Sequence, residues 1–272
     1  MYRITHSLYQ AFYNTPPLWQ GAYEGLDQFA FPEVTLDHTF FPQIPQNLRL
    51  GHQMEFIFHQ LLLHSNTYNV LAYNIPIRKN KISLGEIDFI VQNNTTGQLI
   101  HLELTYKFYI LTDTSENALD QQLIGPNYRD TFVLKKEKLK THQLPLSRSL
   151  EGTQTLRDHG IDPIKLTPQV CFKSQLFTPF YKRNSHLTPF NSECISGSWI
   201  SILDFDSDEF KSYQYYIPTK LEWILNPHND IDWCSYSSIL DRISGQLASK
   251  NSPLVWVKGT TLELKKMFII WR

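Results

Sequence analysis

Hydrophobic and polar positions follow the clearest pattern between residues 50 and 111. Apolar residues first recur at three- and four-residue spacing, which predicts an amphipathic helix of about 14 residues. They are Leu50, Met54, Ile57, Phe58 and Leu61. Three segments at 68–77, 83–91 and 98–111 then show strand-like patterns.

The third of these segments alternates strictly between apolar and polar residues. Its apolar positions are Ile100, Leu102, Leu104, Tyr106 and Phe108, and its polar positions are His101, Glu103, Thr105 and Lys107. Successive side chains of a strand point to opposite faces, so the period of two predicts a strand with one apolar and one polar face.

The flanking regions give weaker patterns. Residues 1–48 are rich in aromatic residues and proline, which predicts a short helix at 5–13 and a wrap around the main domain. Residues 49–145 are expected to form the core, and residues 146–272 to complete the sheet and cover it within one domain. The further expected elements are a helix at 129–143, strands at 169–172, 199–203 and 213–217, a helix at 237–248, and strands at 254–258 and 267–271.

Composition excludes several classes of protein. With 42% hydrophobic and 19% charged residues the chain is too apolar to be disordered, and its net charge of −1 excludes a wholly basic nucleic-acid coat but not a local basic face. No apolar run approaches the roughly 20 residues of a membrane span. The N-terminal residues lack the apolar run of a signal peptide, and the three cysteines are widely separated, so a cytoplasmic protein is expected.

A short turn sets the register of the second and third strands. Residues 94–97 (NTTG) are a natural four-residue loop with a glycine available for a positive φ. If this loop closes a hairpin, Asp88 faces Glu103 and Glu86 faces Thr105.

Opposed carboxylates suggest a metal site. Directly opposed side chains on antiparallel strands have Cβ atoms about 5 Å apart, and like charges there are destabilising unless they are neutralised. Mg²⁺ or Mn²⁺ prefers carboxylate oxygens, so Asp88 and Glu103 predict a metal site of the kind used in phosphodiester hydrolysis, with Glu86 as an additional candidate. The alternative is a solvated polar face on which Asp88 and Glu103 point at water.

Neighbouring residues add further candidates. Glu55 lies at the border of the apolar stripe of the first helix, where a carboxylate is costly unless it is paired or bound to metal. Lys107 shares the polar face of the third strand and is a candidate for stabilising developing negative charge. The alternatives are an ordinary helix-edge carboxylate and a lysine whose stem lies along the end of the strand.

The helix expected at 129–143 is rich in lysine. Its candidates for phosphate contacts are Arg129, Lys135, Lys138 and Gln143. The alternative is a solvated basic helix face.

These residues together resemble known families. A glutamate on a helix, G-E-x-D on a strand, a turn, and E on the next strand followed by a lysine are similar to the core of the PD-(D/E)xK nuclease superfamily. More narrowly, LGEIDFIV, HLELTYKFYI, GPNYRD and THQLPLS resemble the family called domain of unknown function (DUF) 1853, over most of the chain. The resemblance implies an α/β (α+β) fold with a restriction-endonuclease-like αβββαβ core, a mixed central sheet flanked by helices, and N- and C-terminal additions.

The resemblance also implies roles for residues. Glu55 is the helix carboxylate, Asp88 and Glu103 are metal ligands together with Glu55, and Lys107 is the catalytic lysine of a nuclease that requires Mg²⁺ or Mn²⁺ and acts on DNA, with RNA as a lesser expectation. One departure is that the superfamily lysine normally stands two residues after the acid, where this chain has Thr105. Lys107 lies about 6.6 Å farther along the strand. The alternative is therefore an inactive nuclease-like fold that binds nucleic acid or protein.

Overall fold

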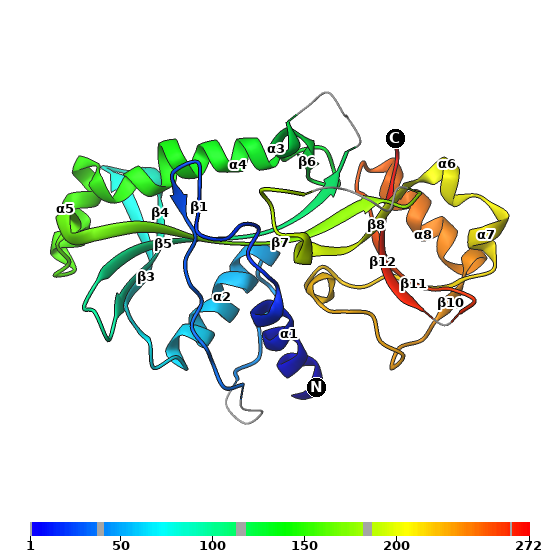
Figure 1. Cartoon of the computed structure of the whole chain (residues 1–272), viewed down its shortest axis with the longest axis horizontal. Coiled ribbons are helices and arrows are strands. Elements are labelled where there is room, and N and C mark those ends of the chain that lie inside the picture. Colours follow the sequence, from blue (N-terminus) through cyan, green and yellow to red (C-terminus); the bar gives the residue numbers. More distant parts are fainter. Residues whose placement is uncertain (1, 37–40, 113–117, 182–186, 262) are drawn as a thin grey trace. The chain divides into compact units, whose positions relative to one another are not determined.

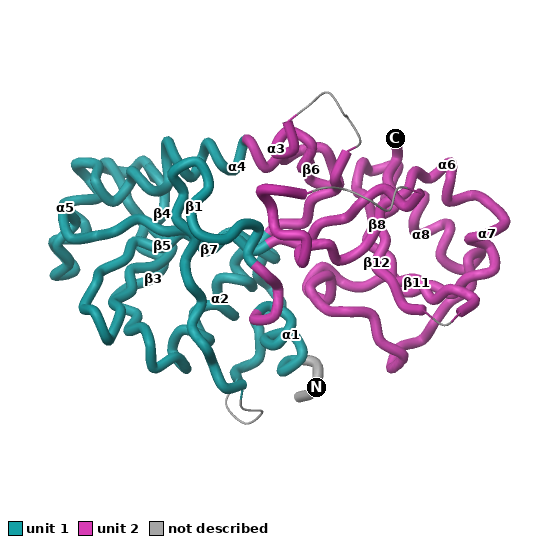
Figure 2. Tube along the Cα trace, viewed as in Figure 1, with its two compact units in different colours: residues 1–12, 17–106, 134–173 teal, residues 13–16, 107–133, 174–272 magenta. Residues whose placement is uncertain are grey.

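Figure 1 shows the computed structural model, which describes residues 2–36, 41–112, 118–181, 187–261 and 263–272. The chain divides into two units (Figure 2). Unit 1 consists of Met1–Phe12, Pro17–Tyr106 and Leu134–Lys173, and unit 2 consists of Tyr13–Pro16, Lys107–Val133 and Ser174–Arg272. The sequence predicts one domain with parts bounded at residues 48 and 145, and in the structure two long strands each contribute residues to both units.

The sheet of unit 1 contains the three strands expected from the sequence. They are β3 (Tyr68–Lys79), β4 (Ile82–Asn93) and β5 (Leu99–Leu111), and β7 (Leu166–Pro179) is the neighbour of β5 on its other side. β3 pairs with β4 and β4 with β5 in antiparallel fashion. The predicted strands are confirmed to within two residues at each end.

The turn between β4 and β5 has the predicted form. Asn93 N–H donates to Gln98 O at 2.9 Å, Gly97 N–H donates to Asn93 O at 2.8 Å, and Gly97 has a φ of +71°. Phe89 lies opposite Leu102, as the predicted register requires. Because this register is confirmed, the positions of Asp88 and Glu103 are those that the sequence predicted.

Helix α2 (Leu50–Leu63) has the bounds expected from its apolar spacing, and aromatic residues pack around it. The ring of Phe58 lies 6.1 Å from Phe12 of α1 (Tyr2–Asn14) and 5.0 Å from Phe89 of β4. Phe29 and Phe31, which follow the small hairpin of β1 (Ala22–Tyr23) and β2 (Leu26–Asp27), contact the same ring. The N-terminal aromatic residues therefore join α2 to the sheet of unit 1.

A second layer covers the opposite face of these strands (Figure 1). It contains α4 (Phe132–Lys138), the π-helical turn η1 (Leu139–Gln143), the 3₁₀ turn η2 (Leu144–Arg148), α5 (Leu150–Asp158) and the 3₁₀ turn η3 (Pro163–Lys165). Its apolar residues form a buried cluster with those of β3 and β4. The cluster consists of Ile75, Ile77, Ile87, Ile90, Leu146, Leu156, Ile161 and Leu166.

The helix predicted at 129–143 begins later than predicted and changes its type before it ends. Tyr128 has a φ of +56°, and Gly125 N–H donates to Asp130 O at 2.8 Å, so a turn occupies the residues before Phe132. This turn follows α3 (Leu119–Gln122) and β6 (Leu123–Ile124). At its other end the α-helix widens into η1 after Lys138.

Unit 2 contains a sheet of mixed direction. β7, β8 (Ile195–Ser201) and β12 (Leu264–Ile270) run parallel, and β11 (Leu254–Lys258), β9 (Gln214–Tyr216) and β10 (Cys234–Ser235) continue the sheet with antiparallel pairings. Its other elements are η4 (Ser192–Cys194), α6 (Ile202–Phe205), α7 (Asp208–Lys211), η5 (Leu221–Ile224) and α8 (Tyr236–Ala248). The expected mixed sheet flanked by helices is thereby confirmed.

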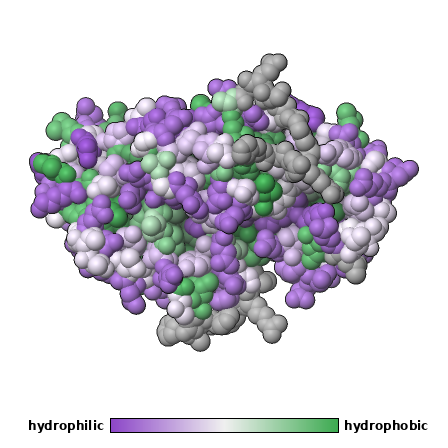
Figure 3. Space-filling model, viewed as in Figure 1, coloured by the Kyte–Doolittle hydropathy of each residue, from purple (hydrophilic) through white to green (hydrophobic). Residues whose placement is uncertain are grey.

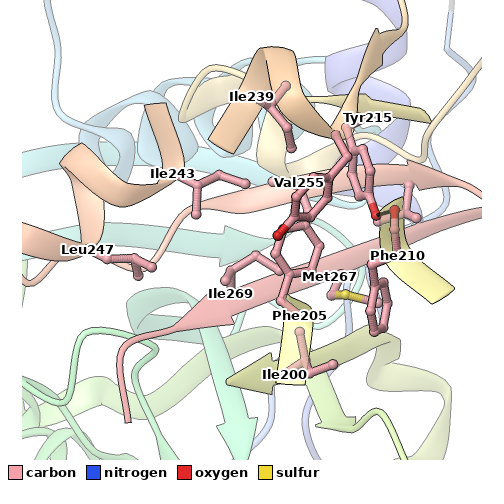
Figure 4. Close-up of a cluster of buried hydrophobic side chains, with 12 residues drawn as sticks. Ile200, Phe205, Phe210, Tyr215, Ile239, Ile243, Leu247, Val255, Met267 and Ile269 are labelled. Atoms are coloured by element: carbon pink, nitrogen blue, oxygen red, sulfur yellow. Dashed lines mark hydrogen bonds between the residues drawn. The ribbon is translucent and has the colours of Figure 1, made fainter. Parts of the chain in front are cut away.

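The core of unit 2 lies between α8 and this sheet (Figure 4). Ile239 and Ile243 of α8 pack with Val255 and Ile269 of the strands, beside the rings of a group of aromatic residues. These are Phe205, Phe210, Tyr215 and Tyr236. The strands predicted at 254–258 and 267–271 and the helix predicted at 237–248 supply most of this core.

On the face drawn in Figure 3, hydrophobic residues are scattered in small groups among hydrophilic ones. Within the described ranges, none of the helices combines the length and the apolar character needed to cross a membrane.

Unit 2 also buries a lysine, Lys266. The Lys266 ammonium group donates to Gln175 Oε1 at 2.7 Å and to the carbonyl of Trp223 at 3.0 Å, and only 1% of the residue is exposed. Burial lowers the pKa of Lys266 from 10.5 to about 7, because the charged form loses its hydration.

We predict that Lys266 makes the free energy of unfolding depend on pH above pH 7. Between pH 7 and 10.5 the unfolded chain binds a proton that the folded chain has released, so the free energy of unfolding rises with pH. In Lys266→Met this rise should be smaller by about 1 to 4 kcal/mol, measured by urea unfolding at several pH values. Other groups titrate equally in both proteins and cancel in the difference. Equal slopes in the two proteins would contradict the prediction.

Candidate functional site

Strands β4 and β5 part at the predicted pair of carboxylates. Their backbone pairing runs from Gln92 opposite Leu99 to Phe89 opposite Leu102. Beyond that point, Leu104 N–H donates to Asp88 Oδ2 at 2.9 Å, and Asp88 N–H approaches Glu103 Oε1 at 3.4 Å. Each carboxylate therefore accepts from the backbone of the opposite strand, where a carbonyl would stand in a continuous ladder.

The two carboxylates are buried, so the alternative that they point at water is wrong. Asp88 is 8% exposed and Glu103 is 0% exposed. The whole polar face of β5 from His101 to Thr105 is buried as well. The sequence pattern showed which side chains share this face, but it did not show that another layer covers them.

The covering layer binds the carboxylate of Glu103 directly. Gln143 Nε2 donates to Glu103 Oε2, and the ammonium group of Lys135 donates to Gln143 Oε1 at 2.8 Å. His101 Nε2 lies 2.9 Å from Glu103 Oε1, and its other ring nitrogen lies 3.0 Å from Ser147 Oγ. Gln143 and His101 thus contact the buried carboxylate of Glu103, and Lys135 and Ser147 contact these two side chains in turn.

The π-helical turn η1 explains why Lys135 and Gln143 meet. In an α-helix, residues eight apart differ by about 80° around the axis, at 100° per residue. The wider π turn rotates the chain by fewer degrees per residue and brings positions 135 and 143 back toward one face. The π turn therefore directs the side chains of Lys135 and Gln143 to the same site.

The electrostatics follow from this burial. The pKa of Asp88 is raised well above its ordinary value, first by burial, then by the charge of Glu103 and, less strongly, that of Glu55. The N–H of Leu104 and the charge of Lys135 act in the opposite direction. The pKa of Glu86 is also raised, by desolvation first and then by Glu55. Glu55, Glu86, Asp88 and Glu103 therefore belong to one negatively charged region.

Helix α2 contributes the outer part of this region. His52 Nδ1 lies 2.8 Å from Glu55 Oε2, one helical turn apart. The pKa of His52 is raised, first by this hydrogen bond and then by the charge of Glu55. Glu55 thus acts on the buried carboxylates through its charge and carries a histidine as its partner.

The remaining predicted residues have other surroundings. Lys107 donates to the carboxylate of Asp130, and both residues belong to unit 2. Arg129 and Lys138 are exposed. The cation whose charge acts on Asp88 is Lys135, which the sequence suggested only as a phosphate contact.

Sequence reasoning missed two members of the site. His101 stood on the same strand face as Glu103 but was left out of the predicted catalytic set, and Ser147 was recognised only as part of the THQLPLS motif. The alternation of β5 was a signal for His101. No periodicity pointed to Ser147, because its contact depends on the turn η2.

Comparison with known proteins gives one match. The model of a protein family described as a domain of unknown function (DUF1853) matches residues 13–270, almost the whole chain. No curated protein and no solved structure matches the chain.

We predict that Asp88 destabilises the metal-free protein as pH rises. Above pH 4 the unfolded chain releases the proton of this carboxyl group while the folded chain retains it, so the free energy of unfolding falls with increasing pH. From pH 4 to 7 the free energy of unfolding of the wild type should fall relative to that of Asp88→Asn. Urea unfolding in a chelator measures this difference. The exposed Glu137→Gln is the control, and a wild-type profile parallel to that of Asp88→Asn would contradict the prediction.

Proposed function

We propose that this chain, which belongs to the DUF1853 family, is a nuclease that needs a divalent metal ion and hydrolyses phosphodiester bonds in DNA. One observation carries the proposal: Asp88 and Glu103 are buried together at the point where two strands part. Burial and, after it, the charge of Glu103 raise the pKa of Asp88, and a divalent cation between the two carboxylates would relieve their repulsion.

The order of elements supports the proposal. Helix α2, the antiparallel strands β3, β4 and β5, helix α4 and strand β7 occur in this order along the chain, with α3 and β6 before α4 and α5 after it. This is the order of the αβββαβ core of the PD-(D/E)xK nucleases, which the sequence motifs resemble. In the proposed core the acids stand at the split between the second and third strands.

The donor atoms suit Mg²⁺ or Mn²⁺. Mg²⁺ is usually held by one or two carboxylates together with waters and substrate phosphates, and Asp88 and Glu103 supply that pair. The described residues contain no group of three His, Cys, Asp or Glu side chains arranged to hold a metal, so the proposed site relies on the pair, with Glu55 nearby. The oxygens of Glu103 already accept hydrogen bonds, but a carboxylate has about four lone-pair sites and can bind a cation as well.

The residues of the protein would have the following roles. A bound divalent ion lowers the pKa of a water ligand and polarises the scissile phosphate. Lys135 would face the negative charge that develops on the phosphate oxygens, and Gln143 would hold its ammonium group in place. We assign this part to Lys135 instead of Lys107, because Lys107 is already paired with Asp130. Lys138, exposed on the same helix, would contact the nucleic-acid backbone.

A second candidate function is binding without turnover. Two observations favour it: Lys107 is engaged by Asp130, and the position two residues after Glu103 is a threonine. A module of this kind would bind Mn²⁺ or nucleic acid and leave the strands intact. Cleavage assays separate the two functions.

We predict that the purified protein cleaves plasmid or single-stranded DNA with Mn²⁺ and that Asp88→Asn and Glu103→Gln each reduce the rate at least about 100-fold. Saturating Mn²⁺ should raise the unfolding temperature of the wild type and change that of either variant much less, because ligand binding stabilises the folded state. Glu137→Gln is the control for loss of an exposed carboxylate. Equal cleavage by the wild type and both variants would contradict the proposal.

We predict that Lys135→Met lowers kcat about 10- to 100-fold while Mn²⁺ affinity is retained. Lys140→Met is the matched control, because Lys140 pairs with Glu24, 3.5 Å away, instead of with the site that contains Asp88 and Glu103. Single-turnover cleavage and calorimetry with Mn²⁺ supply the two measurements. A larger loss in Lys107→Met than in Lys135→Met would instead favour the assignment made from sequence.

A further inference from the structure

Thr105 has a buried hydroxyl group that lacks a partner. The residue is 3% exposed, and within the described part of the chain no atom accepts from or donates to its Oγ1. Burying a hydroxyl group without a hydrogen bond costs free energy, so such groups in native structures call for an explanation. A water molecule or a ligand oxygen is the usual one.

The position of Thr105 places this hydroxyl group beside the proposed site. Thr105 follows Glu103 by two residues on β5, so the two side chains share a strand face. It also directly follows Leu104, whose N–H donates to Asp88 Oδ2 at 2.9 Å. Thr105 therefore follows, on one short stretch of β5, both Glu103 and the backbone N–H that binds Asp88.

The other polar side chains on this face of β5 differ from Thr105 because they have hydrogen-bond partners. Glu103 and His101 on the same face both have hydrogen-bond partners, from Gln143 and from Ser147. The layer that covers the face thus satisfies the other two polar side chains and leaves this one unsatisfied. A valine would fill the same volume on a strand without this cost.

We propose that Thr105 is a positioning residue whose Oγ1 holds a water molecule against the carboxylates of Asp88 and Glu103. The proposal rests on the proposed nuclease function and deepens it, because a water held there would lie beside the carboxylates that would hold the divalent ion. Thr105 replaces the strand lysine of related motifs with a neutral group that orients water. The positive charge then comes from Lys135 on the covering helix.

The experiment compares Thr105→Val, which keeps the shape, with Thr105→Ser, which keeps the hydroxyl group. Calorimetry with Mn²⁺ alone should show an affinity about 10-fold weaker in Thr105→Val, as is typical when a group behind a metal ligand is removed. Its kcat on DNA should fall about 10-fold or more with KM unchanged. Thr105→Ser should recover most of both losses.

The metal-free protein supplies the structural control. Because Thr105 Oγ1 has no partner in the described chain, the urea midpoint of Thr105→Val should equal or exceed that of the wild type. A lower midpoint together with wild-type Mn²⁺ affinity would assign the hydroxyl group to packing and overturn the inference.

The outcomes distinguish the inference from the function on which it rests. If the wild type binds Mn²⁺ and cleaves DNA, and Thr105→Val does both equally well, the inference alone fails. If the wild type binds Mn²⁺ without cleavage and Thr105→Val binds it more weakly, the water site stands and nuclease activity is excluded. If the wild type neither binds Mn²⁺ nor cleaves, both fail.

Discussion

Two buried carboxylates that repel each other constrain the structure of unit 1. Asp88 and Glu103 occupy opposed positions on neighbouring strands, and both are almost completely buried. An ordinary ladder has no place for two negative charges there, and these strands part and present N–H groups to the carboxylates instead. The desolvation that remains appears as the raised pKa of Asp88. Groups with strongly shifted pKa values cluster at functional sites, although structural networks of charges shift pKa values as well.

The layers on both faces of the sheet maintain this arrangement. On one face, Phe58 joins α2 to Phe89, the residue next to Asp88. On the other face, Gly85 has a φ of +154°, and a Cβ atom there would lie 2.9 Å from the Leu146 side chain of η2. A larger residue at position 85 would therefore displace the end of the Leu146 side chain, in the turn that carries Ser147. Packing thus links the geometry of the carboxylates to backbone features outside them.

Local rules predicted the position of Asp88 beside Glu103 because these residues are only 15 positions apart, on strands joined by a short turn. The NTTG turn fixes the register, and a fixed register places Asp88 opposite Glu103. Local rules could not predict that the polar face of β5 is buried, because the residues that cover it lie 40 or more positions later in the sequence. The same holds for Lys107, whose pairing with Asp130 spans 23 positions. The π turn, which directs Lys135 to the site, has no periodic signature in the sequence.

The near-neutral net charge of the chain is accompanied by pairing of the lysines near the proposed site. Helix α4 and η1 carry several lysines, yet Lys136 and Lys140 both pair with Glu24, at 2.9 and 3.5 Å. Lys135 is directed at Gln143 beside the carboxylates, which leaves the exposed Lys138 as the lysine of this stretch best placed to meet a phosphate backbone. Few phosphate contacts mean a shallow dependence of affinity on salt. In the proposed nuclease, a divalent ion at Asp88 and Glu103 therefore has to supply most of the attraction for the substrate, so that binding and cleavage share one requirement.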